Sequence, residues 1–237
     1  GYLVRLAEEA VMKGHAKGHF SATHFRYPVV YGPRQITPTV WTVMRRFIDG
    51  RSHMVLPDGG LTLTTRGYSE NVAHSVLLAA NQPETAAGQI YNCGDEHQLT
   101  LAQWVEMIAK TMDSKIDIIS VPDEYAYPAR ELMMFYGPSN HQLFDLYKLK
   151  SELGYRDVVP PLDAIKRTVH WYRENPPRET SKFTADLNNS YALEDAIADI
   201  YRDTCEKLAA IEYVQPDFHH PYPHPKESGL DRDHRAR

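Results

Sequence analysis

The sequence predicts an α/β protein that contains some parallel sheet. Segments with apolar residues at helical spacing alternate with short extended apolar segments, and glycine and proline separate the two kinds. The length of 237 residues, with 42% hydrophobic and 24% charged residues, is that of a globular chain able to bury a core. The composition therefore favours one large domain or two small ones.

The first quarter of the chain alternates between helix and strand. Apolar residues at helical spacing predict a helix from the first residues to about Gly14, and an extended stretch follows over residues 21–27. A helix over residues 38–48 precedes a short strand over 53–56. A Pro-Asp-Gly-Gly turn then leads into residues 61–65, and this order predicts a hairpin.

The middle of the chain continues the alternation. Ser69 can cap a helix that runs to about Ala80, and residues 89–92 form a short strand. Thr100 caps a further helix whose apolar residues share one face. Residues 116–121 then form a buried strand.

The last part of the chain is predicted to be mainly helical. We expect a short helix over residues 146–153 and a longer one over 161–174. The pair Pro176-Pro177 ends the longer helix. Apolar residues at helical spacing predict an appended docking helix over 193–211, after a polar linker. The chain is thus expected to divide into three parts, a compact part over residues 1–177, a linker with its docking helix over 178–214, and a flexible tail over 215–237.

Composition excludes several classes of function. A formal net charge of -5 and the lack of a basic run argue against a nucleic-acid partner. Apolar runs are far shorter than the roughly 18 residues that span a bilayer, so we expect a soluble cytoplasmic protein without a membrane partner. Cys93 and Cys205 are expected to be buried thiols. His219, His220 and His224 cluster in a proline-rich tail that offers little support for a metal site, so no metal is expected.

Four segments, in this order, resemble one protein family. They are Arg-Tyr-Pro-Val-Val-Tyr-Gly-Pro-Arg at 26–34, Thr-Arg-Gly-Tyr-Ser-Glu-Asn-Val-Ala at 65–73, Gly-Gln-Ile-Tyr-Asn-Cys-Gly at 88–94, and Asp-Leu-Tyr-Lys with Glu-Leu-Gly-Tyr at 145–155. The pattern resembles the extended short-chain dehydrogenases/reductases, which are NAD-dependent epimerases and dehydratases. The resemblance covers about residues 1–177 and is to the C-terminal half of such enzymes.

The resemblance implies a fold and a cofactor. The fold would be the C-terminal part of a Rossmann-like, doubly wound parallel sheet, with a small substrate-binding α/β region and the appended helix. The cofactor would be NAD or NADP. None of the thirteen glycines falls in a phosphate-binding pattern such as G-x-G-x-x-G, so we expect the nucleotide-binding half to lie outside this sequence.

The family chemistry implies catalytic residues in the first helix. It needs a tyrosine phenol whose pKa a nearby lysine lowers, so that the phenol can exchange a proton during hydride transfer. Matching Glu8 to the family helix puts Tyr2 in the tyrosine region and Val4 at the lysine. Matching Glu9 instead puts Arg5 at the lysine, where a guanidinium could supply the charge. Tyr2 and Arg5 are therefore the catalytic candidates, and an ordinary terminal tyrosine is the alternative.

The resemblance also implies binding residues. Tyr27, Pro28 and Val29 correspond to the backbone that approaches the nicotinamide carboxamide, although a strand that simply ends at a proline is the alternative. Arg66 corresponds to a cation that contacts a substrate phosphate, which suits a bidentate guanidinium. An ion pair between Arg66 and Glu70 is the structural alternative.

Two classes of function follow from these observations. The first is an NAD(P)-dependent epimerase, dehydratase or reductase that acts on a sugar nucleotide or another hydroxyl or carbonyl substrate and is incomplete in this sequence. The second is a non-catalytic relative that binds a metabolite or a protein partner, or one chain of a two-chain enzyme. Residues 21–27 would leave an open sheet edge, so a homo-oligomer or a complementary chain is expected.

Overall fold

The computed structural model describes residues 1–133, 137, 139–177 and 187–216. By its contacts the chain divides into two units, Gly1–Tyr201 and Arg202–Arg237. Within the described residues, no helix is long and apolar enough to cross a membrane. The three clustered tail histidines, at positions 219, 220 and 224, lie outside the described residues.

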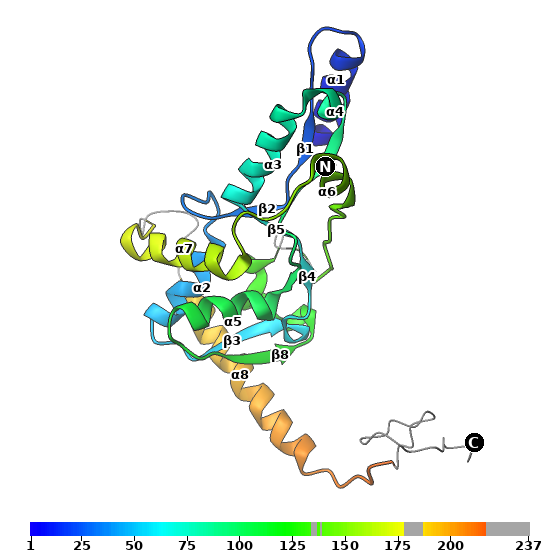
Figure 1. Ribbon diagram of the computed structural model, residues 1–237. Coiled ribbons are helices and arrows are strands. Elements are labelled where there is room, and N and C mark those ends of the chain that lie inside the picture. The colour runs from blue at the N-terminus through cyan, green and yellow to red at the C-terminus, as the bar shows by residue number, and fades with distance from the viewer. Residues whose placement is uncertain (134–136, 138, 178–186, 217–237) are drawn as a thin grey trace, which may run out of the picture. The chain divides into compact units, whose positions relative to one another are not determined.

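Helices and strands alternate in the first unit, as the sequence predicts (Figure 1). The helices are α1 (Tyr2–Ala16), α2 (Thr39–Ile48), α3 (Ser69–Asn81), α4 (Pro83–Ala86), α5 (Leu101–Thr111), α6 (Tyr147–Leu153), α7 (Pro161–Glu174) and α8 (Leu187–Ala209). The strands are β1 (His24–Arg26), β2 (Val29–Tyr31), β3 (His53–Pro57), β4 (Leu63–Thr64), β5 (Arg66–Tyr68), β6 (Ile90–Asn92), β7 (Leu99–Thr100) and β8 (Asp117–Val121). The 3-10 turns among the described residues are η1 (Asp58–Gly60), η2 (Asp123–Tyr125) and η3 (Tyr127–Leu132).

The described strands form four pairs, three of them parallel. Strand β1 pairs with β6, β2 with β5, and β3 with β8, all in parallel, while β4 and β7 are antiparallel. The predicted hairpin is therefore wrong, because β3 and β4 each pair with a different strand. The reason lies in β3, whose residues Met54, Val55 and Leu56 are all buried. A strand buried on both faces suits parallel pairing, here with β8, rather than an antiparallel hairpin.

Three apolar clusters hold the elements together. The largest packs α2, α5 and α7 with the strand ends around Trp104 and Tyr31, whose rings meet edge to face at 4.7 Å between centroids. A second cluster joins β6 and α6 around Tyr91. The third packs Ala198 of α8 against Val55 of β3 and neighbouring residues of β8. The predicted docking helix thus rests on the β3–β8 pair.

Charged side chains fix α8 on this pair. Glu194, which is fully buried, accepts a hydrogen bond from the Val55 backbone N–H at 3.0 Å and lies 3.7 Å from buried Arg46. Arg51 donates hydrogen bonds to Asp195 on the next position of the helix. The buried carboxylate of Glu194 therefore accepts a hydrogen bond from a strand N–H and lies at ion-pair distance from a buried guanidinium.

Helix caps agree with the sequence at one position and differ at another. Thr100 and Gln103 form the capping box of α5, as predicted. Ser69 is the first helical residue of α3 rather than its cap, and the backbone N–H of Tyr68, the residue before it, donates to Asp95. An internal carboxylate thus satisfies the start of this helix, a partner that local sequence does not show.

The two cysteines differ in burial. Cys93 is buried and Cys205 is exposed, and both are free thiols. The prediction is therefore wrong for Cys205, because this residue lies on the part of α8 that follows the residues packed against β3 and β8.

Candidate functional site

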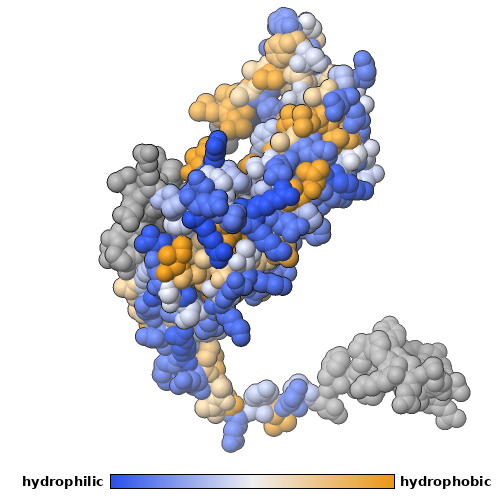
Figure 2. All heavy atoms as spheres, turned by 60° about the vertical axis from the view of Figure 1, so that its left-hand side comes forward, coloured by the Kyte–Doolittle hydropathy of each residue, from blue (hydrophilic) through white to orange (hydrophobic). Residues whose placement is uncertain are grey.

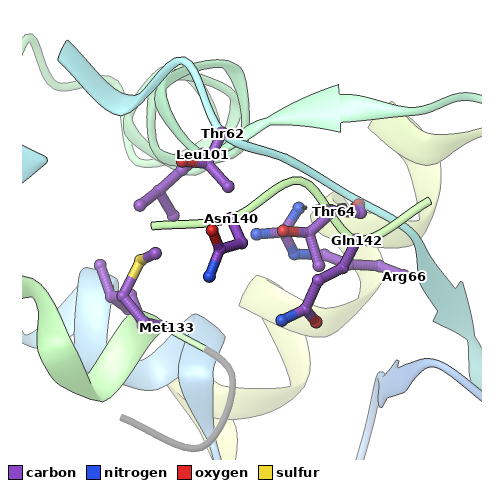
Figure 3. Close-up of a pocket in the computed structure, with 8 residues that line it drawn as sticks. Thr62, Thr64, Arg66, Leu101, Met133, Asn140 and Gln142 are labelled. Atoms are coloured by element: carbon purple, nitrogen blue, oxygen red, sulfur yellow. Dashed lines mark hydrogen bonds between the residues drawn. The ribbon is translucent and has the colours of Figure 1, made fainter. Parts of the chain in front are cut away.

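A narrow pocket opens where β4, β5 and the start of α5 meet residues 139–142 (Figure 3). Its accessible volume of about 10 Å³ is that of a single water molecule. Only one small group of a ligand can therefore enter it. The residues that line it are Thr62, Thr64, Arg66, Leu101, Leu132, Met133, Asn140 and Gln142.

Backbone pairing fixes one wall of the pocket. The Gln142 N–H donates to the Leu63 carbonyl at 2.9 Å, and the Thr65 N–H donates to the Gln142 carbonyl at 2.8 Å. The hydroxyls of Thr62 and Ser139 are also hydrogen bonded to each other. Residues 139–142 thus run along β4, which places the Asn140 and Gln142 amides beside Arg66 (Figure 3).

Arg66 supplies the positive charge among these lining residues. Its guanidinium lies over the Trp104 ring at 4.5 Å from the centroid, and among the described residues it makes one hydrogen bond, a long one of 3.4 Å to the Thr64 carbonyl. Burial lowers its pKa to about 10, and the neighbouring Tyr31 and Asp95 oppose this shift. Arg66 is therefore still charged at neutral pH, with donors available to a ligand.

The alternative pairing of Arg66 with Glu70 is not what the structure shows. Glu70 instead accepts hydrogen bonds from the Tyr68 hydroxyl at 3.0 Å and from Arg167 at 3.0 and 3.1 Å. Its acceptors are thus occupied by other partners. Within the described part of the chain, Arg66 has no carboxylate in an ion pair.

Asp95 fixes the backbone next to the pocket through buried hydrogen bonds. Its Oδ1 accepts hydrogen bonds from the Tyr68 N–H at 2.9 Å and from the Asn71 amide at 2.8 Å, and the residue is only 3% exposed. Burial raises its pKa to about 6, although these hydrogen bonds lower it. Asn71 in turn accepts from the Val159 N–H at 2.9 Å. This network fixes Tyr68 at the end of β5, the strand that begins at Arg66.

The catalytic candidates Tyr2 and Arg5 lie together on the exposed side of α1. Arg5 lies 5.6 Å from the centre of the Tyr2 ring and 3.6 Å from Glu9. Glu8 faces β1 instead and makes two hydrogen bonds with Arg26, at 2.7 and 2.8 Å. Tyr2 is 66% exposed, and no described contact brings it or Arg5 to the Arg66 pocket.

The cofactor candidates lie between β1 and β2. Tyr27 is 48% exposed, and Pro28 is buried where Gly67 and Gly94 leave room for its ring. Val29 pairs with Arg66 in the parallel register of β2 and β5. The backbone of Val29 therefore lies next to the backbone of Arg66, the substrate-binding candidate.

Sequence reasoning missed several residues of this site. Asp95 lies three residues after the end of β6, and a carboxylate just beyond the carboxyl end of a strand in an α/β sheet is a signal that could have found it. Trp104 was predicted only as part of an apolar helix face, yet it is the ring on which Arg66 lies. Asn140 and Gln142 lie in a loop without a motif, and no local signal indicates them.

Comparison with known proteins finds similarity to one family over part of the chain. Residues 2–94 match the family described as "NAD dependent epimerase/dehydratase family". A UDP-N-acetyl-alpha-D-glucosaminuronate decarboxylase from Bacillus cytotoxicus is 27% identical over 176 residues, which are 73% of this chain and 52% of that protein. A dTDP-glucose 4,6-dehydratase from Actinoplanes is 29% identical over 147 residues, 61% of this chain and 42% of that protein. The chain spans about half the length of these curated relatives.

Solved structures give the same fold. UDP-glucose 4-epimerase from Thermotoga maritima superposes with a TM-score of 0.56 at 21% identity, over 72% of this chain and 52% of that one. UDP-glucuronic acid 4-epimerase from Bacillus cereus gives 0.55 at 16% identity, over 73% and 52%. These likenesses confirm the Rossmann-like α/β fold. With the motifs, the match over residues 2–94 shows that this part of the chain is similar to the NAD-dependent epimerase/dehydratase family.

Proposed function

We propose that this chain supplies the substrate-binding part of an NAD(P)-dependent epimerase, dehydratase or related reductase. The observation that carries this proposal is the charged Arg66 guanidinium, which lies in a pocket, has no carboxylate partner among the described residues, and stands within the segment that matches the family. A sugar nucleotide is the proposed substrate, because the names of several relatives contain UDP-sugars or dTDP-sugars.

Arg66 is proposed to bind a phosphate oxygen of this substrate. A guanidinium forms strong, charge-assisted hydrogen bonds with phosphate, and Trp104 holds it in one orientation. The neutral amides of Asn140 and Gln142 can add hydrogen bonds without competing for the charge. Because the pocket is narrow, the sugar and the base would lie outside it.

The proposed cofactor is NAD or NADP, which supplies a hydride acceptor or donor when bound. The backbone from Tyr27 to Val29 is proposed to lie against the nicotinamide end of this cofactor, which the exposure of the Tyr27 ring and the pairing of Val29 with Arg66 support. No glycine-rich loop for its diphosphate occurs in the sequence. These residues would therefore hold one end of the cofactor only.

A second candidate function is binding without turnover. Glu8 of α1 faces β1 and bonds to Arg26. If Glu8 is matched to the family helix, Val4, one helical turn earlier, takes the place of the lysine that the family chemistry needs. Tyr2 and Arg5 would be catalytic only if the substrate reached the exposed side of α1. This observation favours a relative that binds a metabolite, or one chain of a two-chain enzyme.

A partner is proposed on the α1 and β1 side. In the described part of the chain, β1 pairs only with β6, and none of the residues of α1 is buried. Leu3 and Val4 are 77% and 69% exposed. Figure 2 shows hydrophobic residues on the surface at the top of the view, the part that holds α1, α3 and α4 in Figure 1. A second copy or a complementary chain would cover them.

Titration calorimetry with UDP-glucose tests the proposed substrate site. Arg66→Gln should weaken binding by about tenfold or more, since hydrogen bonds to a charged group contribute about 1.5–3 kcal/mol. Arg66→Lys should keep part of the affinity. Arg167→Gln is the matched control, because this exposed arginine pairs with Glu70 outside the pocket. Equal affinities of wild type and Arg66→Gln would refute the role of Arg66.

Fluorescence titration with NADH then distinguishes the two candidate functions, on a protein that carries this chain together with a glycine-rich nucleotide-binding half, because this chain would hold only one end of the cofactor. Binding of both UDP-glucose and NADH by that protein supports the enzyme. Binding of UDP-glucose without NADH, at millimolar NADH, supports the binding protein.

A further inference from the structure

Four residues of the Arg66 pocket come from two segments that follow each other in the chain. Leu132 and Met133 lie at the end of η3, and Asn140 and Gln142 lie further along (Figure 3). All four side chains are uncharged. Contacts outside the pocket must therefore hold these segments in place.

Gln142 is held by β4. Its N–H donates to the Leu63 carbonyl at 2.9 Å, and its carbonyl accepts from the Thr65 N–H at 2.8 Å. His141, the residue before it, accepts a hydrogen bond at Nδ1 from the Leu63 N–H at 3.0 Å. Pairing with a strand thus fixes Gln142 directly.

Asn140 follows a residue that a different contact holds. The backbone N–H of Ser139 donates to Asp123 Oδ1 at 2.9 Å, and the Ser139 hydroxyl contacts that of Thr62. The same Oδ1 accepts from Arg130 Nη1 at 2.9 Å, and Oδ2 accepts from Nη2 at 3.2 Å. The backbone before Asn140 therefore depends on the orientation of the Asp123 carboxylate.

Arg130 sets this orientation. Besides its two bonds to the carboxylate, its guanidinium donates to the Gly137 carbonyl at 3.0 Å and to the Asp123 carbonyl at 2.5 Å. The hydrogen bond from Arg130 lowers the pKa of Asp123, so the carboxylate is charged at neutral pH. The two side chains are 19% and 25% exposed, and two planar groups joined at both ends have one favoured relative orientation.

We propose that Asp123 and Arg130 are positioning residues for substrate binding, which hold the Asn140 amide against the phosphate beside Arg66. This inference rests on the substrate site proposed for Arg66. Neither Asp123 nor Arg130 lines the pocket, so the pair would act through the backbone of Ser139. A pair that only stabilised the fold would leave the contribution of Asn140 to binding unchanged.

Calorimetry with UDP-glucose on the full chain tests the coupling between Arg130 and Asn140. Asn140→Ala and Gln142→Ala should each weaken binding about tenfold, since each removes a hydrogen bond to a charged group. When Arg130→Gln is already present, Asn140→Ala should have no further effect, whereas Gln142→Ala should still cost about tenfold. Arg130→Gln alone should weaken binding about tenfold, the same loss as Asn140→Ala.

Arg45→Gln is the matched control. Arg45 also donates to both oxygens of a carboxylate, Asp49, at 2.8 Å, but it lies in α2 and outside the pocket. In this background Asn140→Ala should still cost about tenfold. Arg130→Lys keeps the charge but not the planar fork of donors, and it should lose part of the coupling. If Arg130→Gln shows no cooperative unfolding in urea, the same comparison in Arg130→Lys decides.

The outcomes separate this inference from the proposed function. If wild type does not bind UDP-glucose, or Arg66→Gln binds it equally well, the substrate site is wrong and the positioning role fails with it. If Arg66→Gln weakens binding but Arg130→Gln does not, or Asn140→Ala costs the same in both backgrounds, only the positioning role is overturned. Loss of the Gln142→Ala effect in Arg130→Gln would also overturn it, because the pair would then hold the fold rather than Asn140.

Discussion

The protonation of Asp95 should control the stability of the fold between pH 4 and pH 7. Burial raises the pKa of this carboxyl in the folded state from 3.8 to about 6. Well below pH 3.8 both the folded and the unfolded chain hold the proton, and Asp95 adds no pH dependence. As the pH rises towards 6, the unfolded chain releases the proton more readily than the folded one, so the free energy of unfolding falls.

The difference between the two pKa values sets the size of this effect. Each unit corresponds to about 1.4 kcal/mol, so a shift of about two units costs the folded state about 3 kcal/mol at neutral pH. Asp95→Asn removes this cost and keeps the acceptor oxygen that Tyr68 and Asn71 use. The variant should therefore gain about 3 kcal/mol relative to wild type between pH 4 and pH 7.

Urea unfolding followed by tryptophan fluorescence measures this difference. Wild type and Asp95→Asn are compared at several pH values from 4 to 8, and groups common to both proteins cancel in the subtraction. The difference in unfolding free energy should grow between about pH 4 and pH 6, with a midpoint near pH 5, and should level off above pH 6. If the two stability curves run parallel over this range, the raised pKa of Asp95 is wrong, and so is the cost assigned to its burial.

Three further changes test other contacts. Glu194→Ala leaves Arg46 buried without its counter-charge, and urea unfolding should show a loss of about 3–5 kcal/mol, whereas Glu194→Gln, which can still accept from Val55, should lose less. Thr100→Ala removes the cap of α5 and should cost about 1 kcal/mol in the same assay. Leu3→Lys should reduce self-association in sedimentation velocity, because it places a charge on the exposed apolar face of α1.

Each of these expectations can fail in a specific way. Equal losses for the two Glu194 variants would show that charge at this position contributes nothing. An unchanged stability of Thr100→Ala would mean that the backbone of α5 is satisfied without the cap. A wild-type chain that sediments as a single monomer would contradict the partner proposed for α1 and β1.

Local signals predicted most of the elements. The bounds of α7 agree with the prediction, because Pro161 starts the helix and the residues after Glu174 end it. The cap at Thr100 was also predictable, since its partner Gln103 lies within one helical turn. Strand pairing was not predictable, because β3 meets β8 only through contacts between distant parts of the chain.

In the candidate site, too, local motifs were predictable and contacts between distant parts of the chain were not. Arg66 could be selected from its motif, but its surroundings depend on Trp104, Asn140 and Gln142, which come from other elements. The role of Glu70 was ambiguous in sequence, and only the position of Arg167 on α7 resolves it. Sequence can thus nominate a charged residue, whereas its free donors become visible only when all its neighbours are known.

The contact between Glu194 and Val55 affects where this chain can be shortened. Glu194 occupies a backbone donor of β3, a strand whose central residues are all apolar. A version that ended at Pro177 would leave this N–H and the apolar surface covered by α8 open to other molecules. Such a strand is a template for intermolecular pairing. We therefore expect shortened versions without α8 to form aggregates during expression, even though every residue of the family match is retained.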